Sequence, residues 1–412
     1  MTRIEEQKSV PYLSYAVFLP TLAVVVLNII TLVFPALIIR LTSMHPSNIN
    51  VFEMGHWTFL LIAVDTMLLG GGLMYYKKSL PSLVQKSFNF ILNFEVSSRV
   101  AFIAIAVLLS LYVGFTIEEL FINEEEQWPD YVILKNALKI WPHQDSSDIY
   151  VSEQLQRHVR MFLLYASENV FHNIKFLPFL ASLSLVILTY FITTKIAKKR
   201  FAGIVATAIL LQSYTFLKYD TIAVYENFWV LFYILSLYLV YTKWYLSPVA
   251  YLLSIFSKAF AAPFLLMTAF LVYRSHIARN KKIQMLFLYA IIIVISITIF
   301  ILSHSVYAGL LDVDFSRFWI GLNAWGNQMR FDLLVISCIL PLVVGLFLKS
   351  TKGIREADSV MILILGALLA GPILTVFTSF YTIHPYRFVP LVVFFAMGVG
   401  TLLASKTNGR DG

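Results

Sequence analysis

The chain has few charged residues and almost no cysteine, and each shortage excludes a class of protein. Charged residues make up 13% of its 412 residues, against about 25% in soluble domains, so no segment has the composition of a separate soluble domain. The single cysteine, Cys338, excludes an intramolecular disulfide framework and a cysteine-based metal site. The net charge of +8 does not indicate nucleic acid, because the basic residues follow a topological pattern.

Long apolar runs take up most of the sequence. Hydrophobic residues account for 59% of the chain, and a membrane-spanning helix needs roughly 20 apolar residues. A stretch at 248–273 is interrupted by Lys258 and Pro263 and is typical of two short helices or a re-entrant pair. The pattern predicts an all-α polytopic membrane protein with about 12 hydrophobic helices. The uninterrupted runs occupy residues 12–39, 57–76, 100–116, 174–194, 201–216, 228–241, 285–302, 333–348, 360–377 and 388–404.

Basic residues alternate between the segments that join these runs. With the N-terminus inside, inside segments hold about 20 basic residues and about six acids, and outside segments about 11 basic residues and 16 acids. The loop at 114–175 is therefore expected on the extracytoplasmic side. The sequence has no evident secretory-pathway signal, which favours a prokaryotic cytoplasmic membrane.

The 114–175 loop combines acidic residues with two amphipathic segments. Pro129–Ile140 and Glu153–Phe171 are expected to form surface helices that lie along the membrane. The second carries Leu155, Val159, Phe162, Leu163 and Ala166 on one side and Gln156, Arg157 and Arg160 on another. Acids beyond the end of a membrane helix escape the bilayer yet face it. They suit a general base acting on a lipid-borne substrate, or they are only a solvated loop. They are Glu118, Glu119, Glu124, Glu125, Glu126 and Asp130.

Between Val100 and Ala404 four motifs follow one another: NEEEQWPDYVILKNAL, KYDTIAVYENFWVLFYILSLYLVY, VAYLLSIFSKAFAAPFLLMTAFLVYR and HPYRFVPLVVFFAMGVG. Their order resembles the GT-C integral-membrane glycosyltransferases, in the branch of protein O-mannosyltransferases and aminoarabinose lipid A transferases. The first of them stands in the place of that family's acidic motif. The family's His-Pro-Pro element is replaced by SEQLQRHV. The resemblance implies a GT-C-like domain at 100–412, with residues 1–99 as a two-helix membrane extension.

The resemblance implies inverting transfer of a sugar from a polyprenyl-phosphate donor to a lipid, glycan or protein acceptor. Such transfer needs a base for the acceptor hydroxyl and cations for the departing phosphate. The register of the acidic motif leaves Glu124, Glu125, Glu126 and Asp130 open, with Glu125 or Glu126 favoured. Glu118 and Glu119 are rivals.

Six further residues are substrate-binding candidates, each with a structural alternative. Glu226 and Asp220 precede a helix whose dipole favours acids. Lys258 meets the donor phosphate or snorkels. His384, Tyr386 and Arg387 bind phosphate or anchor the interface.

The sequence requires no cofactor and assigns no metal site. Asp312 and Asp314 are only weak evidence for a divalent metal. The expected partners are the lipid-linked donor, its acceptor and membrane lipids. Two other functions stay open: a lipid or small-molecule transporter, which needs repeated broken helices and midplane charges, and a non-catalytic membrane scaffold, in which the candidate residues share no cavity.

Overall fold

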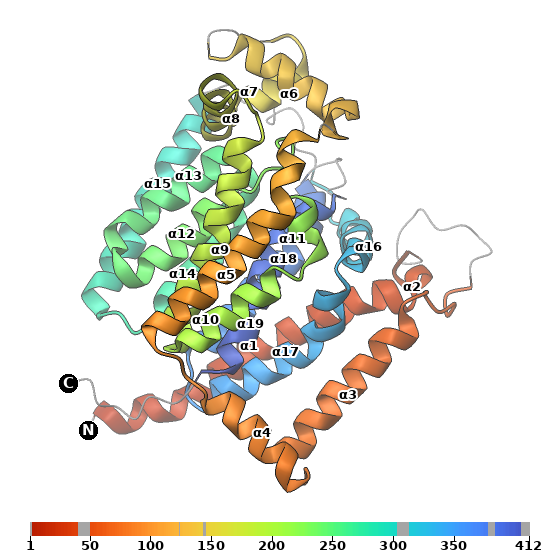
Figure 1. The fold of residues 1–412 in the computed structure, drawn as a ribbon, viewed down its shortest axis with the longest axis vertical. Coiled ribbons are helices and arrows are strands. Elements are labelled where there is room, and N and C mark those ends of the chain that lie inside the picture. Colours follow the sequence, from red (N-terminus) through yellow and green to blue (C-terminus); the bar gives the residue numbers. More distant parts are fainter. Residues whose placement is uncertain are drawn as a thin grey trace. The chain divides into compact units, whose positions relative to one another are not determined.

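The computed structural model describes residues 2–39, 50–122, 124–142, 146–302, 313–377 and 384–404. Within these ranges the chain forms helices joined by turns and short connections, and no strand (Figure 1). Seven of the described helices are long and apolar enough to cross a membrane, which confirms an all-α integral membrane protein. They are Tyr12–Val33, Thr58–Tyr76, Ser98–Phe121, Phe176–Ala197, Leu333–Thr351, Glu356–Phe377 and Pro385–Leu402. Shorter apolar helices accompany them, and the count of about 12 stays a prediction.

The chain divides into two compact units. Unit 1 comprises Met1–Ala101, Thr193–Tyr214 and Asp312–Gly412, and unit 2 comprises Phe102–Ile192 and Thr215–Leu311. The helices are α1 (Thr2–Val33), α2 (Pro35–Ile39), α3 (Thr58–Tyr76), α4 (Ser82–Asn93), α5 (Ser98–Thr116), α6 (Pro129–Ile140), α7 (Ile149–Leu155), α8 (His158–Phe171), α9 (Phe176–Ala197), α10 (Arg200–Leu210), α11 (Tyr214–Lys218), α12 (Phe228–Thr242), α13 (Ser247–Ser257), α14 (Leu265–Arg274), α15 (Arg279–Leu302), α16 (Arg317–Gln328), α17 (Leu333–Thr351), α18 (Glu356–Phe377) and α19 (Val389–Leu402).

Unit 1 is built around α1, α17, α18 and α19. Helix α1 packs on α16, α17 and α18, while α19 packs on α10, α17 and α18. Helix α3 packs on α17. The N-terminal helices therefore share a core with the C-terminal ones, and the division expected after Arg99 does not coincide with the division into compact units.

Close packing between α16 and α18 depends on a glycine. A Cβ atom added to Gly371 would lie 2.2 Å from the ring of Trp325, which is fully buried and lies 4.3 Å from the ring of Phe388, centroid to centroid. Gly71 in α3 has no atom within 4 Å of the same added position.

We expect Gly371→Ala to lower the free energy of unfolding by about 1–3 kcal/mol, because overpacking forces the Trp325 ring out of place. Gly71→Ala is the matched control in a second membrane helix and is expected to cost nothing. Thermal unfolding of the purified variants in detergent measures both. Equal stability of the two variants would contradict the packing role of Gly371.

Unit 2 contains the interrupted segment and the surface helices. Helix α13 ends before Lys258, a 3₁₀ helix η4 (Ala259–Phe264) follows, and α14 continues, which confirms two short helices. Helix α13 packs on α8, α12 and α15. Helices α6, α7 and α8 gather at one end of α5 and α9 (Figure 1).

The surface helices confirm one expectation and correct another. Helix α6 has the expected bounds. A single helix over 153–171 is wrong, because the backbone of Arg157 leaves the helical region, with φ −87° and ψ 61°, between α7 and α8. The residues of α8 that are buried within the protein are Arg160, Met161, Leu164 and Ser167, so Arg160 lies on an interior side of this helix.

Candidate functional site

A small charged cavity lies where α5 ends in unit 2. Beyond α5 the chain forms two 3₁₀ helices, η1 (Ile117–Phe121) and η2 (Glu124–Gln127). The cavity has a volume of about 100 Å³ and is lined by Glu119, Ile122, Glu124, Glu125, Lys175, Lys218, Thr221 and Ile222. Three carboxylates and two ammonium groups from four segments of the chain therefore meet in one hollow.

Lys175 is fixed in the cavity wall by the turn that precedes α9. Its Nζ donates to the carbonyl oxygen of Glu119 at 3.2 Å and to that of Ile122. It lies 3.8 Å from Oε1 of Glu125. The Asn173 side chain supports the same turn by donating to the Leu120 carbonyl at 3.0 Å. The ammonium group of Lys175 is therefore surrounded by oxygen atoms just beyond the end of α5.

Glu125 is buried, and its carboxylate oxygens accept hydrogen bonds from backbone N–H groups. It is 1% exposed; Oε1 accepts from the N–H of Ala223 at 3.3 Å and Oε2 from that of Val224 at 3.1 Å. Burial raises the pKa of Glu125, against the N–H group of Val224 and the charge of Lys175, which lower it. The carboxylate anchors the loop 219–227, and both of its oxygens already have a donor.

Arg160 binds the carbonyl oxygens of the same two residues, Ala223 and Val224. It is 1% exposed; Nε donates to Oε2 of Glu226 at 2.7 Å, and NH2 donates to the carbonyls of Ala223 and Val224 at 3.3 and 2.9 Å. Its NH1 also donates to Gln154. Glu125 and Arg160 thus satisfy the N–H and C=O groups of two consecutive buried residues, and buried backbone groups without partners are costly.

The remaining acids of the segment differ in what they contact. Glu119 is half-buried and accepts from the Thr221 hydroxyl at 3.1 Å. Glu124 is exposed and lies 3.3 Å from Lys218 Nζ. Asp130 accepts from the Tyr225 hydroxyl at 2.8 Å. Glu118 and Glu126 are exposed and are not among the lining residues.

Asp220 is a buried carboxyl next to the cavity wall. It is 0% exposed, and neither carboxyl oxygen has a hydrogen bond of good geometry from a described residue. Burial raises the pKa of Asp220 to about 8, and the charge of Glu119 adds to this, whereas the nearby Tyr112 hydroxyl lowers it. Near neutral pH this residue therefore holds or releases a proton with little change in free energy.

The raised pKa of Asp220 predicts a pH-dependent loss of stability. Since the folded protein keeps this proton up to about pH 8 and the unfolded chain loses it near pH 4, its stabilising contribution is full below pH 4. It falls as pH rises from about 4 to 8. Asp220→Asn should remove this fall, so that the variant gains stability relative to the parent at pH 8 but not at pH 4. Thermal unfolding at several pH values tests this, and parallel curves would contradict it.

The cavity lining does not include the other predicted substrate residues. Glu226 is buried against Arg160. Lys258 is buried at the break between α13 and η4, and the described residues that line the cavity do not include it. His384, Tyr386 and Arg387 belong to unit 1, where Arg387 donates to the Tyr386 hydroxyl at 3.2 Å. Their roles stay predictions.

Sequence reasoning missed Lys175, Lys218 and Thr221 in the cavity and Arg160 behind it. Lys175 and Lys218 carried a signal, since each is a lone base at one end of a segment that joins two apolar runs. No sequence signal pointed to Arg160, because its neighbours Gln156 and Arg157 make that side of the segment look exposed to solvent.

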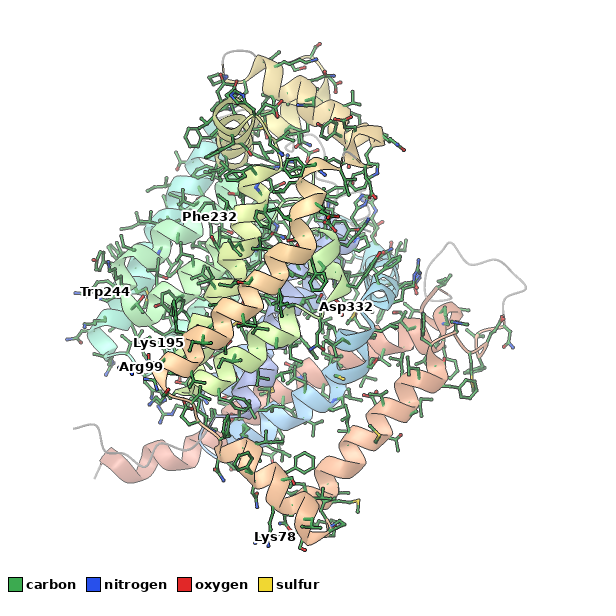
Figure 2. The ribbon with its side chains drawn as sticks, in the orientation of Figure 1. Lys78, Arg99, Lys195, Phe232, Trp244 and Asp332 are labelled. Carbon is green, nitrogen blue, oxygen red and sulfur yellow. The ribbon has the colours of Figure 1, made fainter. Side chains whose placement is uncertain are left out.

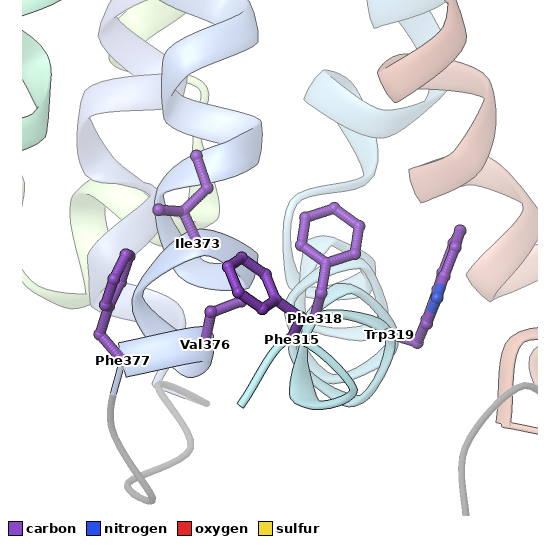
Figure 3. Close-up of a pocket in the computed structure, with 6 residues that line it drawn as sticks. All are labelled: Phe315, Phe318, Trp319, Ile373, Val376 and Phe377. Carbon is purple, nitrogen blue, oxygen red and sulfur yellow. The ribbon is translucent and has the colours of Figure 1, made fainter. Parts of the chain in front are cut away.

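An apolar hollow in unit 1 offers a contrast. It has a volume of about 370 Å³. Figure 3 shows three aromatic side chains at and before the start of α16, and two aliphatic side chains and Phe377 from α18. The lining is Phe315, Phe318, Trp319, Ile373, Val376 and Phe377. The residues that line this hollow include no titratable group, so it suits an apolar ligand rather than acid–base chemistry.

Metal-binding groups do not gather in the part of the chain that the structure describes. There, no three His, Cys, Asp or Glu residues are placed to hold an ion. Asp312 lies outside the described residues, and Asp314 pairs with Arg317 at 3.3 Å.

Comparison of the chain with protein-family models, curated proteins and solved structures found no match.

Proposed function

We propose that this integral membrane protein is a glycosyltransferase of GT-C type, with about 12 hydrophobic helices, that transfers a sugar from a polyprenyl-phosphate donor. The acceptor is a lipid, glycan or protein at the extracytoplasmic face of a prokaryotic cytoplasmic membrane. The observation that supports it most is the cavity at the end of α5, where Glu119 and Glu124 lie with Lys175 and Lys218.

The lysines are the groups suited to the phosphate of the donor. Lys175 is almost completely buried, and Lys218 is partly exposed at the cavity mouth. Cations fixed in a poorly solvated hollow stabilise a developing phosphate charge more strongly than cations in water. The cavity volume of about 100 Å³ is that of roughly three water molecules at about 30 Å³ each. The cavity is therefore large enough for the reacting phosphate but not for the prenyl chain, which stays outside.

Glu119 is the carboxylate best placed to act as base. Glu125 has both oxygens engaged by backbone N–H groups, whereas Glu119 has one hydrogen bond, from Thr221. In the proposed step the acceptor oxygen bonds to the anomeric carbon, and its proton passes to Glu119. The bond from that carbon to the phosphate oxygen breaks with inversion, and its electron pair leaves with the phosphate near the two lysines.

The direct test is transfer of label. Purified protein in lipid vesicles is incubated with radiolabelled polyprenyl-phosphate sugars and membrane extract, and the labelled product is identified. Transfer is expected from one donor and should be lost when Lys175 and Lys218 are both replaced by glutamine. Retention of transfer by that double variant, or no transfer from any donor, would overturn the proposal.

A further inference from the structure

Helix α4 of unit 1 is apolar over most of its circumference. Apart from Leu92, which packs on a cluster that includes Ala197 and Ala202, the described part of the chain leaves its apolar side chains exposed. None of its residues is buried, and its apolar side chains are exposed: Leu83, Val84, Phe88, Phe90 and Ile91. Twelve residues extend about 18 Å at 1.5 Å per residue, too short to cross a hydrocarbon core of about 30 Å. An exposed amphipathic helix of this length lies in the plane of a membrane surface.

The polar side of α4 is a narrow stripe with one positive charge. Gln85, Lys86, Asn89 and Asn93 recur at helical spacing. The Tyr75 hydroxyl donates to Oδ1 of Asn89 at 2.8 Å, so the NH₂ group is the donor that Asn89 offers. A hollow of about 480 Å³ follows this stripe, lined by Lys86, Asn89, Phe90, Asn93, Phe94 and Glu95.

The surroundings of α4 are strongly basic. Lys77 and Lys78 directly follow the end of α3, and Arg99 lies in the first turn of α5. Figure 2 shows Lys78 at the corner between α3 and α4. Lys199 donates to the Leu92 carbonyl at 2.6 Å. The one acid between residues 77 and 101, Glu95, accepts from the backbone N–H of Arg200 at 3.0 Å.

We propose that α4 is a recognition element for anionic phospholipid. Its apolar side chains enter the bilayer surface, and the hollow along its polar stripe receives the headgroup phosphate at Lys86, with Asn89 and Asn93 as donors. Charge decides the occupant, because four bases and one acid lie in residues 77–101, and basic segments next to membrane helices bind anionic lipid. This inference does not depend on the transferase proposal.

The test is lipid occupancy of the full-length protein. The parent, Lys86→Gln and the matched control Lys139→Gln, an exposed lysine of α6, are titrated with phosphatidylglycerol or phosphatidylcholine and examined by native mass spectrometry. Lys86→Gln should reduce phosphatidylglycerol occupancy several-fold, while Lys139→Gln and all phosphatidylcholine titrations should not change. Because Lys86 is exposed, its replacement leaves the fold intact, and thermal unfolding without added lipid checks this.

Two further arms separate the possible occupants. Inorganic phosphate and glycerol phosphate compete with phosphatidylglycerol only if the hollow is a free-anion site, so full competition by either would overturn the lipid assignment. A fluorophore on Phe90→Cys, in a Cys338→Ser background, should shift to the blue in phosphatidylglycerol vesicles. No shift, or equal phosphatidylglycerol binding by Lys86→Gln and the parent, would also overturn it.

Discussion

Replacing Arg160 with methionine should lower the free energy of unfolding by about 3–5 kcal/mol, because removing one partner of a buried ion pair leaves the other charge uncompensated. Here the charge is Glu226, which is 2% exposed, and the carbonyls of Ala223 and Val224 lose their donor as well. Thermal unfolding of the purified variant in detergent gives the change.

Arg157 provides the control in the same helix region. It pairs with Glu153, and both side chains keep some solvent contact, so Arg157→Met is expected to cost no more than about 1 kcal/mol. A second variant, Arg160→Met with Glu226→Gln, should recover part of the loss by removing the buried charge. If Arg160→Met unfolds at the temperature of Arg157→Met, the buried pair does not hold the 219–227 loop.

Glu119→Gln is expected to reduce the rate of sugar transfer by roughly 10²–10⁴-fold, the usual contribution of a general base. Glutamine keeps the size and the hydrogen bond from Thr221 but cannot take the proton of the acceptor. Donor binding should change little, because Lys175 and Lys218 remain. Initial rates with saturating donor, set beside donor affinity, separate the two effects.

The neighbouring acids serve as controls for Glu119. Glu118 is one residue away, exposed and outside the cavity lining, so Glu118→Gln should transfer at the parent rate. Glu125→Gln should lose stability as well as activity, because one of its oxygens becomes an amide that cannot accept an N–H. An unchanged rate in Glu119→Gln, with loss in Glu124→Gln, would move the base to Glu124.

The apolar pattern predicted the membrane class and several local features. The break at Lys258 and the bounds of α6 are confirmed, since proline, charge and helical spacing act locally. The packing of α1 against α17 and α18 was not predictable, because apolar helices carry no mark of their partners when lipid and protein are equally apolar.

The candidate site was predictable in place but not in composition. The acidic segment after α5 does form a cavity, yet Glu125, favoured from the motif, serves a buried backbone. Hydrogen bonds from side chains to distant peptide groups leave no period in a sequence. The burial of Arg160 inside α8 is the clearest case, since the 219–227 loop that accepts its hydrogen bonds is far from α8 in the sequence.

The hydrogen bonds from Ala223 and Val224 to Glu125, and from Arg160 to the same two residues, have a consequence for the order in which the chain folds. Glu125 and Arg160 are both translated before residue 223, so the ribosome delivers the two partners ahead of the peptide groups that need them. Until residues 124–160 have reached their place in the fold, the backbone N–H and C=O groups of Ala223 and Val224 lack these two partners. Placement of that segment is therefore a precondition for closing this part of the protein.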